Sequence, residues 1–185
     1  PQAVAADSQG NVFVVGGFTN TISFGETTLT SAGGTDAFVA ALDEKGVAKW
    51  ASRYGDGGEQ IANAVAVDAR GEISFAGALA GAADFGGGVL TSKGEDDVFV
   101  AKLSAKGVHQ WSQRFGEGGA QRAFGLGVDG GGNLVLTGTF SGALDFGGGP
   151  LPNRGGRDTF VAKLSPTGEH RLSRSFGGLS DQLAR

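Results

Sequence analysis

The chain has 185 residues, 39% of them hydrophobic, with 36 glycines and only four prolines. This composition provides enough apolar surface for a folded core, and the glycines follow no third-residue period, so a disordered chain and a collagen-like chain are both excluded. The formal net charge is −4 with both signs interspersed and no basic run, which argues against nucleic acid as a partner.

Going along the chain, four short strands are predicted in each of three successive segments, residues 1–63, 64–124 and 125–185. The turn Asp68-Ala-Arg-Gly71 separates the first two strands of the second segment, because Asp accepts bonds from nearby backbone and Gly tolerates positive φ. A longer connection, Leu79–Asp96, precedes the third strand. No segment shows a 3.6-residue apolar period, so the chain is expected to be all-β. The predicted strands of the second segment are Ile61–Asp68, Glu72–Ala78, Asp97–Leu103 and Val108–Phe115.

The strongest signal is an internal repeat with a period of 61 residues. It is clearest in the third predicted strand, which reads Asp-x-Phe-Val-Ala-x-Leu at residues 36–42, 97–103 and 158–164. The turns and the long connections align in the same register without insertion, so each segment is expected to pack against its neighbour in the same way. The repeat positions expected to be structural are Asp36, Asp97, Asp158, Phe38, Phe99, Phe160, Phe24, Phe85 and Phe146.

The faces of the strands favour a β-propeller over a sandwich or a solenoid. Phe99 and Leu103 point to one face of the third strand, and Val98 and Val100 to the other, which is typical of a sheet covered on both faces. The fourth strand has a polar face that suits an exposed edge, and the first strand is rich in small residues. We therefore expect three four-stranded antiparallel propeller blades. The side chains expected between blades are Phe38, Phe99 and Phe160, with Leu42, Leu103 and Leu164 close by.

Three motifs recur with this period: Ala66-Val67-Asp68 before Gly71-Glu72, then Asp97-Val-Phe-Val-Ala-Lys-Leu103, then Trp111-Ser112 before Phe115-Gly116. Together they resemble the bacterial β-propeller repeat known as the SBBP repeat, over essentially the whole chain. Two small departures are Leu172 in place of the tryptophan and Ala41 in place of the lysine. The resemblance implies an exported bacterial protein, extracellular or on the cell surface, with a binding or surface role and more than three blades in a complete ring.

Two motifs that suggest phosphate chemistry are better explained as turns. Asp84-Phe85-Gly86 and Asp145-Phe146-Gly147 match the metal-binding motif of protein kinases, but the order of motifs is reversed and no His-Arg-Asp loop is present. The glycine runs lack the Gly-Lys-Ser/Thr ending of a P-loop and the βαβ context of a dinucleotide site. Phe85 is instead expected to anchor the long connection onto its blade.

The repeated acidic residues and the two histidines are expected to be structural rather than metal ligands. A calcium site needs about six to eight oxygen ligands, whereas each Asp-x-x-Gly turn supplies one carboxylate, so capping of the backbone is the preferred role. The acidic run Glu95-Asp96-Asp97 leaves incidental metal binding open. His109 and His170 belong to different segments and are expected to be solvated. The turn aspartates are Asp7, Asp68 and Asp129, and those expected to cap the third strands are Asp36, Asp97 and Asp158.

These observations predict a non-catalytic scaffold that binds a protein or another ligand, or serves surface display. No catalytic, cofactor-binding or metal-binding residue is predicted, because the candidates recur in every segment, whereas an active site is a single constellation. A structural element of a surface assembly is an open alternative. A propeller-based enzyme, such as a lactonase or a quinoprotein, is another, but it would show loop insertions or segment-specific His and Glu clusters.

The repeat also predicts where a partner would bind. The long connections and the links such as Gly55–Gln60 are expected on one side of the ring, opposite the Asp-x-x-Gly turns. Sequence varies most between segments on that side, and loops on a rigid scaffold commonly carry recognition. Drift of unselected solvent positions is the alternative explanation. The residues predicted to contact a partner are Lys93, Asp96, Glu117, Arg154 and Arg157.

Three further observations concern cellular location and completeness. No apolar run approaches the roughly 18 residues needed to span a bilayer, so no membrane span is expected. The chain has no cysteine, which excludes a disulfide framework and fits an exported protein, although it fits other compartments as well. It also has no methionine, so a processed product or a fragment is expected. Because three blades leave two apolar end faces, we expect the chain to be a segment of a longer ring, or to self-associate so that two copies give six blades.

Overall fold

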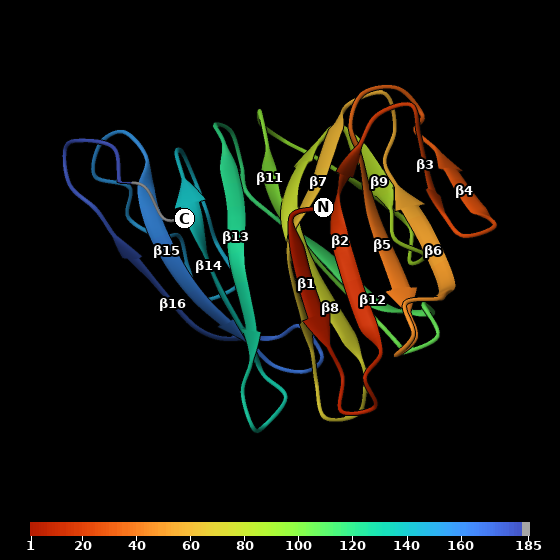
Figure 1. Cartoon of the computed structure of the whole chain (residues 1–185). Helices are drawn as coiled ribbons and strands as arrows, with labels where there is room; N and C mark the ends of the chain where they lie inside the picture. Colours follow the sequence, from red (N-terminus) through yellow and green to blue (C-terminus); the bar gives the residue numbers. More distant parts are fainter. Residues whose placement is uncertain (183–185) are drawn as a thin grey trace.

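The computed structural model describes residues 1–182, which form β-strands and no helix (Figure 1). The strands form three four-stranded antiparallel sheets and two two-stranded hairpins. The prediction of an all-β chain is therefore confirmed. No helix that could cross a membrane is found in this range.

Each four-stranded sheet is built from strands that follow one another in the chain. The first sheet has the order β1 (Ala3–Ala6), β2 (Val12–Phe18), β5 (Asp36–Leu42), β6 (Ala48–Tyr54). The second has the order β7 (Glu59–Val67), β8 (Ile73–Ala80), β11 (Asp97–Leu103), β12 (His109–Phe115). The third has the order β13 (Gln121–Val128), β14 (Leu134–Phe140), β15 (Asp158–Leu164), β16 (His170–Phe176). The hairpins are β3 (Thr21–Phe24) with β4 (Thr27–Thr30), and β9 (Ala82–Asp84) with β10 (Val89–Thr91).

The long connection of the second segment is partly ordered as strands. It contains the hairpin β9–β10, and the first segment has the hairpin β3–β4 at the same place. The second hairpin forms because it packs on the second sheet. Ala83 is 3% exposed and Phe85, which stacks on Phe99 of that sheet, is 2% exposed. The third strand of the second sheet spans Asp97–Leu103 as predicted, and the other strands of that sheet differ from the prediction by one or two residues at their ends.

A bulge in the first strand brings two backbones together at a glycine. The register of β7 on β8 shifts between Ala62 and Ala64. A Cβ atom at Gly77 would lie 1.8 Å from the carbonyl oxygen of Ile61, so the strand accepts no larger residue here. The third sheet repeats the arrangement, because a Cβ at Gly138 would lie 2.0 Å from the carbonyl oxygen of Arg122.

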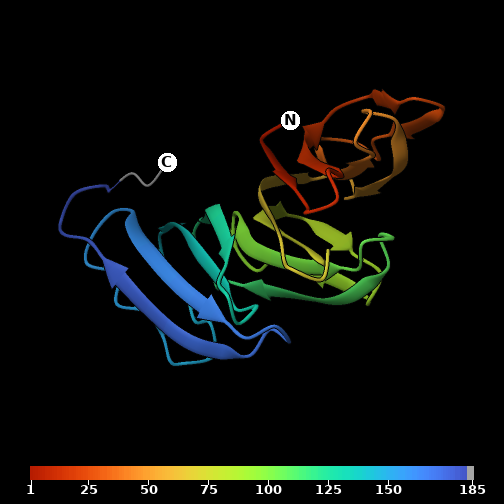
Figure 2. The same ribbon diagram turned by 60° about the horizontal axis from the view of Figure 1, so that its bottom comes forward.

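The sheets face one another across two joints, and their first strands are neighbours near the middle of the molecule (Figures 1 and 2). We call the contact between the first and second sheets the first joint, and that between the second and third sheets the second joint. Phe75 and Phe99 belong to the apolar cluster of the first joint, and Val98 and Phe160 to that of the second. Because β11 supplies Phe99 to one joint and Val98 to the other, the second sheet is covered on both faces, as predicted.

The three repeated phenylalanines of the third strands are buried, but not all between sheets. Phe38, Phe99 and Phe160 are 1%, 0% and 0% exposed, which confirms their predicted burial. Phe38, however, lies on the outward face of the first sheet, where Phe18 and Phe24 cover it. The expectation that Phe38 packs between two sheets was wrong for residues 1–182, because no other sheet in this range packs on that face of the first sheet. Leu42 on the same face is half-buried, whereas Leu103 and Leu164 are fully buried.

A second set of repeated phenylalanines fixes the long connections to the sheets, as predicted for Phe85. The ring of Phe85 stacks on Phe99 with 4.8 Å between centroids. The equivalent pairs are Phe24 with Phe38 at 5.3 Å and Phe146 with Phe160 at 5.1 Å.

The aspartate that opens each third strand is fully buried and caps backbone, as expected. Asp97 Oδ2 accepts a hydrogen bond from the Lys93 backbone N–H at 2.8 Å and forms an ion pair with Arg114. Asp36 forms the same pair with Arg53, which the sequence analysis did not foresee. In the third sheet Asp158 caps the Arg154 N–H at 2.8 Å, but Ser175 stands at the position of the arginine.

Candidate ligand cavity between the first and second sheets

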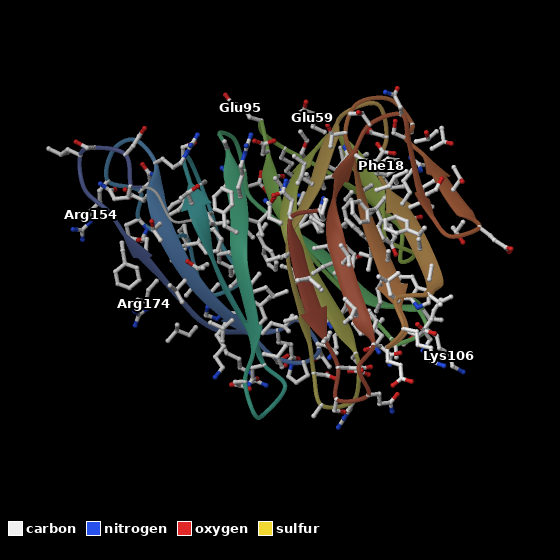
Figure 3. The ribbon with its side chains drawn as sticks, in the orientation of Figure 1. Phe18, Glu59, Glu95, Lys106, Arg154 and Arg174 are labelled. Carbon is white, nitrogen blue, oxygen red and sulfur yellow. The ribbon has the colours of Figure 1, made fainter. Side chains whose placement is uncertain are left out.

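The Asp-x-x-Gly turns gather at one end of the molecule, together with the turns between third and fourth strands. Asp68 Oδ1 accepts hydrogen bonds from the backbone N–H groups of Arg70 and Glu72, both at 2.9 Å. Asp7 and Asp129 cap their turns in the same way, which confirms the capping role. We call this the turn end; Lys106 marks it in Figure 3, and Glu59 and Glu95 lie at the opposite, hairpin end.

At the turn end of the second joint, a buried lysine fills the space next to the capping aspartate. Lys102 is 2% exposed, and its Nζ lies 3.2 Å from Asp68 Oδ2 and 2.8 Å from Glu72 Oε2. Burial opposes ionisation of Asp68, but hydrogen bonds from the Glu72 and Arg70 N–H groups and from Lys102 lower its pKa overall. The Lys102 amino group thus lies between the carboxyl groups of Asp68 and Glu72.

The first sheet has Ala41 at this position, and its surroundings differ accordingly. Asp7 accepts a hydrogen bond from the Asn11 side chain at 2.7 Å instead of pairing with a lysine. Asn11 Oδ1 in turn accepts a hydrogen bond from Lys49 Nζ at 3.1 Å. The bond from Asn11 lowers the pKa of Asp7, so this carboxylate is ionised at neutral pH.

The two joints also differ in the volume of the cavity next to this position. The cavity at Ala41 has a volume of about 570 Å³, whereas its counterpart at Lys102 has about 250 Å³. The larger volume lies within the range of roughly 300–1,000 Å³ that is usual for small-molecule sites. Of the two joints, the first therefore has the room for a small ligand.

The walls of this cavity combine an apolar floor with a mostly cationic rim. Phe13, Ala41 and Trp50 line it, and the Trp50 indole is held by a hydrogen bond of 3.2 Å from its N–H to the Ala105 carbonyl. The ionisable residues of the lining are Asp7, Lys49, Arg70 and Lys106. Within residues 1–182, neither Arg70 nor Lys106 forms an ion pair with a carboxylate. Ala41 is visible in the sequence as a departure from the repeat, but nothing in the sequence connects it with a site.

The residues predicted to bind a partner lie at the hairpin end in two groups. Lys93 and Glu117 form an ion pair with 2.6 Å between Nζ and Oε1, and both side chains are exposed. The hydrogen bond from Lys93 lowers the pKa of Glu117. Arg154 and Arg157 belong to the long connection of the third sheet, where Arg154 points outward (Figure 3).

Asp96 does not belong to the accessible part of this surface. It is 8% exposed, and its Oδ2 accepts a hydrogen bond from Arg122 Nε at 2.7 Å across the second joint. Asp97 beside it pairs with Arg114, while Glu95 is exposed. The three acidic side chains of this run therefore have different partners and do not converge on one point. Among the described residues, no group of three or more potential metal ligands is found.

Reversing the charge of Arg154 and Arg157 together is expected to change the free energy of unfolding by no more than about 0.5 kcal/mol. Both residues contribute to the fold through backbone N–H groups, at 2.8 Å from Asp158 and Asp181, and these remain in the variant. Urea denaturation would measure the change. A partner that binds at the hairpin end would lose affinity for this variant, and reversal of Lys45 and Lys106 at the turn end is the control.

The two histidines support the long connections instead of standing free in solvent. His109 Nε2 lies 3.1 Å from Ser112 Oγ, and a Cβ at Gly87 would lie 2.2 Å from His109 Cε1. His170 makes the same contacts with Ser173 and Gly148. The expectation that both are solvated was wrong in part, because each ring is half-buried against the glycines of the connection.

Comparison with known proteins returns no matching family model and no matching curated protein. The resemblance to the SBBP repeat therefore rests on the repeat motifs of the sequence alone.

Proposed function

We propose that this chain is a non-catalytic β-propeller scaffold whose first joint binds a small organic anion. The propeller arrangement is supported by three antiparallel four-stranded sheets of one repeat, set side by side with neighbouring first strands. Packing of sheet faces across each joint is the contact that propeller blades make. The 61-residue period gives each sheet the same part in the assembly.

The observation that carries the binding proposal is the replacement of the joint lysine by Ala41. At Lys102 the cation and its carboxylates occupy the space, whereas at Ala41 a cavity of about 570 Å³ is open to a ligand. At this position the first sheet departs from the repeat, since Ala41 has a smaller side chain than Lys102 and Lys163 of the other two sheets. Binding sites on repeat scaffolds arise where one unit departs from the others, because the shared positions serve the fold.

The chemistry of the lining indicates the ligand class. Lys49, Arg70 and Lys106 favour an anion, and the ionised Asp7 with Asn11 provides acceptors for hydroxyl or amine groups. Trp50 offers apolar surface of the kind on which the carbon face of a sugar ring packs. A uronic acid combines these features, with a carboxylate, several hydroxyls and a ring.

Two other functions stay open as weaker alternatives. A purely structural element of a surface assembly would have no use for an open cavity at the first joint. A propeller-based enzyme would need a catalytic group in the cavity, and its lining contains no histidine and a single carboxylate that is engaged by Asn11. An exported, extracellular or surface location is part of the proposal on the strength of the repeat resemblance.

The test is to titrate D-glucuronate into the 185-residue chain by isothermal calorimetry, with D-glucose as the neutral control. We expect glucuronate to bind, and glucose to bind at least tenfold more weakly. Ala41→Lys is expected to weaken glucuronate binding at least tenfold while the chain stays folded. The new lysine can reach Asp7 as Lys102 reaches Asp68 at 3.2 Å, so the substitution has a precedent in the fold.

Matched controls separate the cavity from the overall charge. Arg171→Glu changes the same charge as Arg70→Glu, but Arg171 lies on the third sheet, away from the cavity. Binding should fall for Arg70→Glu and stay unchanged for Arg171→Glu. No binding to the wild-type chain at about 10 mM glucuronate, or equal loss in both variants, would contradict the proposal.

A further inference from the structure

The outward face of the third sheet exposes an aromatic ring that the other two sheets bury. Phe176 ends β16, at the repeat position of Tyr54 in the first sheet and Phe115 in the second. Tyr54 and Phe115 are each 7% exposed, whereas Phe176 is 56% exposed. The difference comes from what covers the position and not from the residue type, because Phe115 and Phe176 are identical.

In both joints the cover comes from the sheet that follows in the chain. The ring of Tyr54 lies 5.1 Å from Phe85 and 5.6 Å from Phe75, both in the second segment. The ring of Phe115 lies 4.8 Å from Phe146 in the third segment. The third sheet has no following sheet within residues 1–182, so Phe176 lacks this cover.

The neighbours of Phe176 show the same loss of cover. Val161 is half-buried, although its counterparts Val39 and Val100 are fully buried. Leu172 is 43% exposed and Val135 is 36% exposed. We call this outward side of the third sheet, with Val135, Val161, Leu172 and Phe176, the trailing face.

The outward side of the first sheet carries the counterparts of the covering residues. Phe24 corresponds to Phe85 and Phe146, and Val14 corresponds to Phe75. Both are half-buried and belong to the apolar cluster of that side, together with Ile22 and Leu29. We call this side, with Val14, Ile22, Phe24 and Leu29, the leading face. Each end of the molecule is thus one half of a joint that the molecule already contains twice.

A polar contact at the start of the second and third sheets has a counterpart at the end of the chain. Gln60 Nε2 of β7 donates to the Ala80 carbonyl of β8 at 2.6 Å within the second sheet, and Gln121 Nε2 of β13 donates to the Ser141 carbonyl after β14 at 2.5 Å within the third. Gln182 follows in the repeat, and its Oε1 accepts the Gly178 N–H at 3.0 Å as Gln60 accepts the Asp56 N–H at 3.1 Å. The carbonyl that would correspond on the leading side is that of Thr19.

The two end faces also differ from the internal joints by a pair of opposite charges. In the second joint Gln113 contacts the turn of the next sheet, because a Cβ at Gly168 would lie 2.6 Å from its Nε2. The trailing face has Arg174 at the position of Gln113, and the corresponding turn of the first sheet contains Glu44 where the other turns have Ala105 and Pro166. Both Arg174 and Glu44 are exposed. Arg174 and Glu44 would therefore contact each other if the trailing face packed on the first sheet of a second copy, and they put opposite charges where the internal joints have neutral residues.

We propose that the trailing face binds the leading face of a second copy of this chain, head to tail, so that two copies close a ring of six sheets through two identical joints. Figure 2 shows the three sheets following one another along an arc, which is the arrangement that such a pair needs. A contact between two different faces generates a closed ring when the rotation completes a full turn. The inference rests on the propeller arrangement proposed above, but not on ligand binding.

The first measurement is the mass of the 185-residue chain by analytical ultracentrifugation over a range of concentrations. We expect a reversible dimer of twice the 18.5 kDa chain mass and no larger species. A monomer at every concentration, or a mass that keeps growing with concentration, would overturn the proposal. A failure to dimerise would leave glucuronate binding intact, because both walls of that cavity belong to one chain.

Single substitutions on the two faces then test the pairing. Phe176→Asp on the trailing face and Val14→Asp or Phe24→Asp on the leading face are each expected to raise the dimer dissociation constant at least tenfold. Circular dichroism would show that each variant is folded, and Val14→Asp covers the case in which Phe24→Asp disturbs Phe38. Equal mixing of the Phe176→Asp and Val14→Asp variants should restore heterodimers, since one of the two joints is then intact. Loss of the dimer with Phe176→Asp alone would indicate contact between two trailing faces and contradict the head-to-tail arrangement.

A charge exchange gives an independent test with exposed residues that do not endanger the fold. Arg174→Glu and Glu44→Arg are each expected to weaken the dimer by roughly two- to fivefold, the effect of an exposed ion pair. The double variant in one chain should regain wild-type affinity, because each joint then has the pair in reverse. Additive losses in the double variant would contradict the proposed contact.

Discussion

The Phe99→Ala variant is expected to lose about 3–5 kcal/mol of its free energy of unfolding. Phe99 is fully buried in the first joint, where its ring stacks on Phe85 at 4.8 Å and meets Phe75 edge-on at 5.8 Å. Removing the ring leaves a void and also frees the anchor of the β9–β10 connection. Such a loss is a large part of the 5–15 kcal/mol that a typical domain has.

Urea denaturation followed by tryptophan fluorescence would measure this loss, because Trp50 lies in the same joint. Val89→Ala is the control, since Val89 on the β9–β10 hairpin is 66% exposed and should change stability by less than about 0.5 kcal/mol. A loss below about 1 kcal/mol for Phe99→Ala would contradict the tight packing of the joint. Loss of ligand binding by this variant would not be informative about Ala41, because the whole joint would be disturbed.

The repeat made much of this architecture predictable from sequence, because its signals are local. Strand Asp97–Leu103 was predicted with its bounds, since apolar alternation and the flanking turns are encoded within the strand itself. The capping role of Asp68 follows from a turn of four residues, and its backbone bonds at 2.9 Å are of that kind. The burial of Phe99 and Phe160 follows from the same alternation.

The features that could not be predicted from the sequence depend on contacts between sheets. Asp96 looked like a surface residue, but Arg122 on β13 of the third sheet covers it. Phe38 looked like its two counterparts, although no second sheet packs against its face within residues 1–182. The departure at Ala41 was visible, but the cavity depends on where Arg70 and Ala105 of the second sheet lie. Local pattern therefore identified the positions, and only the three-dimensional arrangement of the sheets showed their surroundings.

Replacing Asp97 with alanine is expected to lower the free energy of unfolding by about 3–5 kcal/mol, the usual effect of breaking a buried ion pair from one side. Asp97 is fully buried, accepts the Lys93 N–H at 2.8 Å and pairs with Arg114, whose side chain is 15% exposed. The variant removes the buried anion of the guanidinium, which keeps the exposed Glu117 carboxylate at 3.5 Å, and it leaves the Lys93 N–H without its acceptor. The size of the loss therefore has two parts, one from the ion pair and one from the cap.

The repeat supplies the variant that separates these parts. Asp158→Ala removes the same backbone cap, from the Arg154 N–H at 2.8 Å, but Ser175 replaces the arginine there, so the expected loss is about 1–3 kcal/mol. Arg114→Ser gives the second sheet the serine that the third sheet has at this position. In the Arg114→Ser background, Asp97→Ala should lower the free energy of unfolding by no more than Asp158→Ala does in the wild type. Urea denaturation of the wild type, Asp97→Ala, Arg114→Ser and the double variant completes a double-mutant cycle for the pair. An equal loss for Asp97→Ala with and without Arg114 would show that the aspartate acts through the backbone cap alone.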